Sequence, residues 1–87
     1  MRRFLSSKNL YVGQLVVTAD AVNSTVCTIA EIDTKTSRVI LQWMDNNRFI
    51  SEGYPSYMLK KPTLEQVEWS IVNRGPLISS EQIIHWA

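Results

Sequence analysis

Residues 38–48 of the chain read Arg-Val-Ile-Leu-Gln-Trp-Met-Asp-Asn-Asn-Arg, and this stretch decides the fold class. Its side chains alternate, so that Val39, Leu41 and Trp43 share one face, as in a β-strand that turns one face toward a core. The Asp-Asn-Asn triplet that follows is typical of a tight turn, because these residues tolerate positive φ. Residues 48–51 then predict a short returning strand. The stretch therefore predicts an antiparallel hairpin.

Three more strands are predicted on either side of this hairpin. Residues 10–18 are rich in β-branched and aromatic residues and predict a strand that begins near Gln14. Residues 25–33 alternate with apolar side chains on both faces, and a polar connector of hairpin length joins them to the next strand. The Gly-Tyr-Pro-Ser run at 53–56 breaks the strand pattern, and residues 57–60 predict a brief fifth strand.

The hydrophobic period changes from two to that of a helix after residue 62. Leu64, Val67 and Ile71 fall on one helical stripe, which we expect to cover an opening or an edge of the strand domain. Thr63 and Gln66 have the spacing of a capping box, and an Arg-Gly-Pro sequence at 74–76 ends the helix. The same capping pattern at Ser79 and Gln82 predicts a second short helix that continues through Trp86.

The length and composition allow one globular domain. The chain has 87 residues, of which 45% are hydrophobic and 20% are charged, so a disordered chain is excluded. Lys and Arg number 9 against 8 for Asp and Glu. A domain that binds phosphate backbones usually has a clear basic excess, so the charge does not favour nucleic acid.

Chemistry-bearing motifs are missing from the sequence. Cys27 is the only cysteine, which excludes an intramolecular disulfide and predicts a reducing, cytoplasmic compartment. His85 has no second histidine or cysteine nearby that would make a metal site. The sequence contains no paired nucleophile and base, no phosphate-binding loop and no apolar run long enough for a membrane span. We therefore expect no enzyme activity, no cofactor and no membrane association.

Three segments of the chain resemble the small-barrel superfamily that contains Tudor, chromo-barrel and KOW modules. They are Gly-Gln-Leu-Val-Val at 13–17, Val-Ile-Leu-Gln-Trp-Met-Asp-Asn-Asn at 39–47 and Tyr-Pro-Ser-Tyr-Met-Leu at 54–59. The resemblance implies a mainly β, SH3-like barrel of five strands and a binding role. The predicted organisation is a polar N-terminal arm at 1–9, the barrel at 10–61, and a tail of two short α-helices at 62–87 packed on the barrel.

Four aromatic side chains are the first candidate binding site. Tudor-like modules use aromatic rings to enclose methylated ammonium groups, and in such a barrel the candidate rings would gather near one end. They are Trp43, Phe49, Tyr54 and Tyr57, with Asp45 and Glu52 as anionic neighbours. The alternative is structural: Trp43 and Phe49 belong to the core, and Tyr57 packs the closing turn.

The helical tail supplies further candidate contacts. Trp69 lies off the apolar stripe, so it either covers the barrel or contacts a partner. Ile83, Ile84 and Trp86 could form an apolar patch through which the chain self-associates or captures a partner. The predicted function is that of a non-enzymatic module for protein–protein binding. By analogy of size, the chain is further predicted to be a phage or mobile-element modulator of a host protein. The alternative is a nucleic-acid-binding barrel that uses the scattered Arg and Lys side chains.

Overall fold

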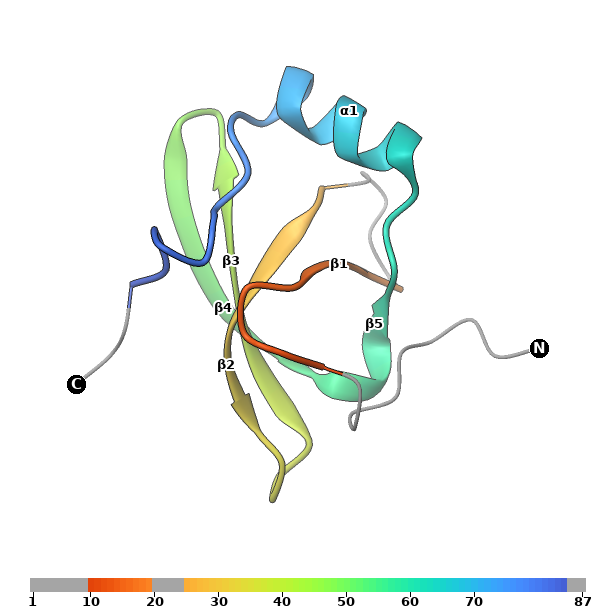
Figure 1. The fold of residues 1–87 in the computed structure, drawn as a ribbon, viewed down its shortest axis with the longest axis vertical. Coiled ribbons are helices and arrows are strands. Elements are labelled where there is room, and N and C mark those ends of the chain that lie inside the picture. Colours follow the sequence, from red (N-terminus) through yellow and green to blue (C-terminus); the bar gives the residue numbers. More distant parts are fainter. Residues whose placement is uncertain (1–9, 20–24, 85–87) are drawn as a thin grey trace.

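The computed structural model describes residues 10–19 and 25–84, which form a mainly β domain with one α-helix (Figure 1). In chain order its elements are β1 (Leu15–Thr18), β2 (Cys27–Asp33), β3 (Arg38–Asp45), β4 (Arg48–Pro55), the 3-10 helix η2 (Ser56–Met58), β5 (Leu59–Lys60) and α1 (Leu64–Asn73).

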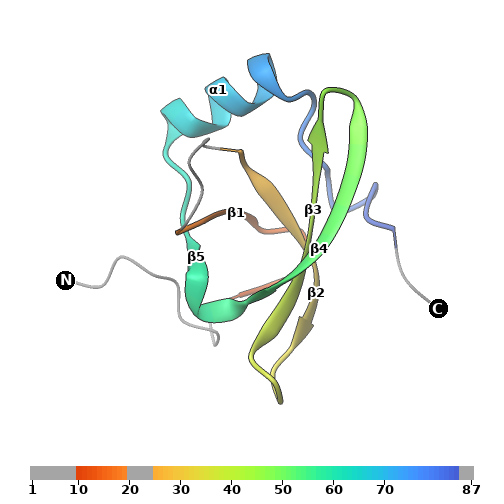
Figure 2. The same cartoon turned by 180° about the vertical axis from the view of Figure 1, so that it is seen from behind.

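The five strands form one antiparallel sheet in the order β4-β3-β2-β1-β5, and the sheet curls into a half-barrel (Figures 1 and 2). The short strand β1 lies between β2 and β5 in the sheet: Val16 pairs with Cys27 of β2, and Thr18 pairs with Leu59 of β5. The mainly β prediction with five strands is therefore confirmed.

The β3–β4 hairpin forms at the turn that the sequence predicts. Asn46 and Asn47 both have positive φ, at 53° and 66°, and Asp45 pairs with Arg48 across the turn. The predicted break after residue 52 is wrong, because β4 continues in register to Pro55. Proline is tolerated there because β4 is an edge strand, so its missing N–H leaves no neighbouring strand without a donor.

The main core lies on the concave inner face of the half-barrel. Val39 and Leu41 of β3 are fully buried there, as the alternation predicts, while Trp43 is only partly buried against them. The buried members of this core are Val16, Cys27, Ile29, Val39, Leu41 and Leu59, and Leu10, Ile32, Trp43 and Tyr54 pack around them.

A second, smaller core lies on the outer face of β2 and β3. The chain after α1 returns across this face, and we call residues 76–84 the C-terminal strap; Figure 1 shows it in blue beside β3. Ile78 and Ile83 of the strap are buried against Ala30, with Ile40 and Met44 beside them. The part of the outer face formed by Ala30, Ile40 and Met44 is thus covered by the chain's own C-terminal region.

The strap contains one turn and no helix, so the predicted second helix is wrong within residues 79–84. The capping contact itself is present: the Ser79 N–H donates to Gln82 Oε1 at 3.0 Å, and the Gln82 N–H donates to the Ser79 carbonyl at 2.9 Å. Ile78 and Ile83, on either side of this turn, are both buried against the outer face of the sheet. Trp86 lies outside the described residues.

Polar contacts fix the strap on the sheet. The Gln42 side chain, which is 0% exposed, donates to the Ile84 carbonyl at 3.0 Å and accepts the Ile84 N–H at 3.1 Å. The Thr28 hydroxyl donates to the Ile78 carbonyl. Ser80 passes close to Gly13, where a Cβ atom would lie 2.9 Å from Ser80 Cβ at a φ of +93°, so a side chain there would both strain the backbone and displace the strap.

Helix α1 begins with the predicted capping box at Thr63 and Gln66, which is confirmed. The predicted packing stripe is wrong for two of its three residues: Leu64 is 74% exposed and Ile71 47%, whereas Val67 is partly buried. The helix turns Ser70 to the interior. Polar anchors explain this orientation, because the buried Ser70 hydroxyl accepts the Val26 N–H at 3.0 Å. Arg74 at the end of the helix contacts Asp45 at 3.3 Å.

Candidate interaction surfaces

The structure brings two of the four candidate rings together. Trp43 and Tyr54 lie with their ring centroids 6.4 Å apart at an interplanar angle of 57°. Both belong to the inner face near the edge of the sheet, where the Tyr54 hydroxyl donates to Glu52 Oε2 at 3.3 Å. Because Trp43 and Tyr54 also pack on the main core, they contribute to folding as well as to this surface.

The other two rings lie elsewhere. Phe49 pairs with Met44, whereas Trp43 pairs with Ile50, so Phe49 lies on the opposite face of the sheet from Trp43. Phe49 is 37% exposed, which also excludes it from the core. Tyr57 belongs to η2 and is 71% exposed. No four-ring cluster forms among the described residues.

Of the two candidate tryptophans in the tail, the structure describes Trp69 and not Trp86. Trp69 is partly buried, and the Arg74 guanidinium carbon lies 5.3 Å from its ring centroid, which is the geometry of a cation–π contact. The same guanidinium reaches Thr25 and Asp45, so Trp69 belongs to the joint between α1 and the sheet. Trp86 lies outside the described residues.

Of the helices and strands that the structure describes, α1 carries the most exposed large apolar side chains. Leu64 is 74% exposed, Ile71 47% and Val72 83%. At 100° per residue they lie on a single arc, and Glu65 and Glu68 fall on the same arc. We call these five residues the outer face of α1. The sequence signal for this surface is the stripe that contains Leu64 and Ile71, although hydrophobic periodicity predicts that this stripe packs on the strand domain.

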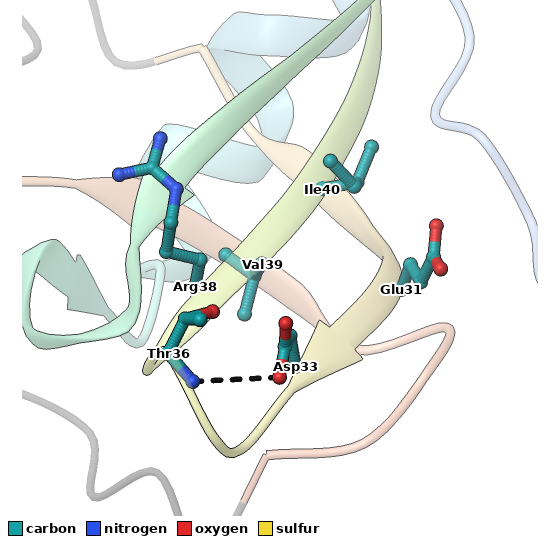
Figure 3. Close-up of a pocket in the computed structure, with 6 residues that line it drawn as sticks. All are labelled: Glu31, Asp33, Thr36, Arg38, Val39 and Ile40. Atoms are coloured by element: carbon teal, nitrogen blue, oxygen red, sulfur yellow. Dashed lines mark hydrogen bonds between the residues drawn. The ribbon is translucent and has the colours of Figure 1, made fainter.

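A small pocket lies beside the β2–β3 turn (Figure 3). Its volume is about 240 Å³, and its lining residues are Glu31, Asp33, Thr36, Arg38, Val39 and Ile40. Figure 3 shows the Arg38 guanidinium pointing away from the two carboxylates. Asp33 Oδ1 accepts the Lys35 N–H at 3.0 Å, and hydrogen bonds from the Thr36 side chain and the Lys35 backbone lower the pKa of Asp33. The Asp33 carboxylate therefore serves to hold the β2–β3 turn.

The Cys27 thiol is buried in the main core. Burial raises its pKa from the ordinary value of 9.0 to about 12, and the nearby Glu52 carboxylate adds to the shift. A thiol in this environment stays protonated and is a poor nucleophile at neutral pH. Within residues 10–19 and 25–84, no three His, Cys, Asp or Glu side chains are grouped so that they could hold a metal ion.

Comparison with protein-family models, with curated proteins and with solved structures found no match to the chain. Of the helices in the described part of the chain, none has the length and apolar character needed to cross a bilayer.

Proposed function

We propose that the chain is a non-enzymatic binding module built on an SH3-like small barrel, and that it binds a protein partner through the outer face of α1. The barrel assignment is supported by the order of the elements. The antiparallel β2-β3-β4 meander leads through η2 into β5, and β5 pairs back onto β1.

The exposure of Leu64, Ile71 and Val72 is the observation that supports this proposal. Each large aliphatic side chain left in water forgoes burial worth roughly 1.5–3 kcal/mol. Three such side chains on one short helix, rather than scattered singly, are typical of a protein interaction site.

The helix is held in place before any partner arrives. Ser70 anchors its middle to the start of the sheet, and Arg74 anchors its end to Asp45 and Thr25. The Asn46 N–H also donates to the Arg74 carbonyl at 3.1 Å. A fixed helix presents its outer face without the entropic cost of ordering it on binding.

The charges on this face indicate the chemistry of the partner. Glu65 and Glu68 lie among the three apolar side chains, and α1 has no basic residue in its last turn. A complementary segment would carry apolar anchors flanked by Lys or Arg, as in an amphipathic helix that packs against another helix. Self-pairing of this face is disfavoured, because Glu68 near its centre would meet Glu68 of a second copy.

The proposal can be tested by affinity capture followed by a direct binding measurement. The immobilised wild-type chain and an Ile71→Asp/Val72→Asp variant are compared for proteins retained from nuclease-treated lysate. Each protein that the wild type retains is then purified and titrated by calorimetry. We expect the double variant to weaken binding at least tenfold, with thermal unfolding close to that of the wild type because both side chains are exposed.

A matched control changes charge without touching this face: Lys35→Glu, on the β2–β3 turn, should leave the affinity unchanged. Equal binding by the double variant would contradict the assignment of the surface. Retention of nucleic acid from untreated lysate, with affinity falling steeply as salt rises, would instead favour the nucleic-acid alternative. The role as a phage or mobile-element modulator stays a prediction, which the genes next to the coding sequence would test.

A further inference from the structure

The outer edge of β4 is a second candidate surface for a binding partner. This strand ends the sheet, and no segment within residues 10–19 and 25–84 pairs with its free side. On an edge strand, every second residue points its N–H and C=O away from the neighbouring strand and can accept a further strand. Long edges are usually blunted, and the proline of β4 lies only at its last position.

The sequence of β4 is complementary to itself. It reads Arg-Phe-Ile-Ser-Glu-Gly-Tyr-Pro from 48 to 55. When two copies pair antiparallel with Ile50 opposite Ile50, Arg48 of each copy lies opposite Glu52 of the other. Both ion pairs form on the same face, because residues 48, 50 and 52 share one face of a strand.

The side chains on the other face fit the same register. Phe49 of each copy lies opposite Ser51 of the other, so the 37% exposed ring would gain cover from the second sheet. Pro55 falls beyond the paired residues 48–52 and does not interrupt them. Registers centred on Arg48 or on Glu52 would instead place like charges opposite each other, which is destabilising.

We propose that two copies of the chain associate through their β4 edges, antiparallel and centred on Ile50, so that the two sheets become one continuous sheet. This interface is separate from the outer face of α1 and does not depend on the function proposed for that face. It is also separate from Ile83 and Ile84 of the C-terminal strap. Self-association through Ile83, Ile84 and Trp86 stays a prediction, and Trp86 lies outside the described residues. Ile83 is buried within its own copy.

Charge exchange tests the register. Sedimentation equilibrium of the wild type in low salt should give an average mass that rises from monomer to dimer with concentration. Arg48→Glu and Glu52→Arg should each weaken this association at least tenfold, because each puts two like-charged pairs in the interface. The Arg48→Glu/Glu52→Arg double variant should restore it, and an equimolar mixture of the two single variants should form a heterodimer.

Lys35→Glu and Glu81→Arg change the net charge by the same amounts away from β4 and serve as matched controls. They should associate as the wild type does. A wild type that stays monomeric up to millimolar concentration overturns the proposal. A dimer that responds neither to the single exchanges nor to their combination overturns it as well, since another surface would then carry the contact.

Disulfide trapping provides a second readout that does not rely on charge. In a Cys27→Ala background, Ile50→Cys should give a covalent dimer under mild oxidation, since directly opposite Cβ atoms are about 4.5–5.5 Å apart. Ser51→Cys, one position away, faces Phe49 of the other copy and should cross-link much more slowly. Equal cross-linking at both positions would show random collision and would contradict the register.

Discussion

Gln42 is the residue whose role differs most from what its place in the sequence suggests. It stands between two apolar neighbours in a strand, where a polar side chain is usually turned to solvent. It is instead fully buried, and its amide pairs with both backbone groups of Ile84, as a neighbouring strand would do. Alternation predicts that Gln42 faces away from Leu41, but not that another segment covers it. That contact joins residues 42 positions apart, beyond the reach of any local pattern.

Cys27 gives a prediction about pH at the scale of a single residue. Its folded-state pKa is about 12, raised by burial and then by Glu52, against 9.0 for the free thiol. Below pH 9 the thiol is protonated in both states, so its contribution is fully present. Above pH 9 only the unfolded chain loses the proton, so the free energy of unfolding should fall by up to about 1.4 kcal/mol per pH unit.

Urea unfolding of the wild type and of Cys27→Ala between pH 8 and 11 would measure this effect. All other ionisable groups are common to the two proteins, so the difference between the two curves isolates the thiol. We expect the wild type to lose stability relative to the variant as pH rises above 9. Parallel curves would show that the thiol ionises as readily in the folded protein as in the unfolded chain.

At the scale of the element, the sequence predicted where α1 begins and ends but not which side it turns inward. The capping box and the Arg-Gly end are local signals, and both boundaries are close to the prediction. The inward side is decided by two contacts to distant residues, Ser70 with Val26 and Arg74 with Asp45. Because a serine is buried in place of Leu64 and Ile71, those two apolar side chains are exposed, and hydrophobic periodicity alone does not reveal this.

The contribution of Ser70 can be tested against an exposed neighbour. Ser70→Ala removes the acceptor for the buried Val26 N–H, and an unsatisfied buried donor costs about 1–3 kcal/mol. Val72→Ala removes more apolar surface, yet the side chain is 83% exposed, so its cost should be about 0.5 kcal/mol or less. Chemical unfolding would compare the two. A larger loss for Val72→Ala would mean that α1 buries the opposite side.

For the strands, as for α1, the features that depend on neighbouring residues were predicted, and the features that depend on distant parts of the fold were not. Turn chemistry at Asp45-Asn46-Asn47 and alternation in β3 predicted the central hairpin well, because both depend on neighbouring residues. The continuation of β4 through Gly53 and Pro55 was missed. Those two residues normally weaken or end a strand. The position of β4 at the edge of the sheet makes Pro55 acceptable, and Gly53 stays paired with Ile40.

At the scale of the whole molecule, the sheet carries one core on its inner face and a second on its outer face, and the strap supplies the cover of the second. Ile83→Ala should cost about 2–4 kcal/mol, because the side chain fills the second core with Ala30 and Ile78. Ile84→Ala is the matched control: the side chain is 48% exposed, and only its backbone contacts Gln42. Thermal unfolding of both variants would measure the difference. Similar losses would show that the strap does not pack as described.

The candidate sites were predictable only where they follow from the alternation of side chains between the two faces of a strand. Trp43 and Tyr54 came together because they share the inner face of neighbouring strands. Phe49 did not join them, because a single step along β4 moves a side chain to the other face. The outer face of α1 and the edge of β4 depend on the orientation of a helix and on the order of strands, which are properties of the assembled domain.

The strap also sets an order of events during synthesis. The β2-β3-β4 meander depends on short-range contacts, so we expect it to form first, whereas Thr28 contacts Ile78 across 50 positions of chain. A ribosome adding 5–20 residues per second needs roughly 1.5–6 s to pass from the end of β4 to the end of the strap. During that interval the apolar side chains of Ala30, Ile40 and Met44 lie on the outer face of the sheet without the strap that covers them later. The growing polypeptide is therefore a better target for chaperones, and more prone to aggregation, than the finished protein.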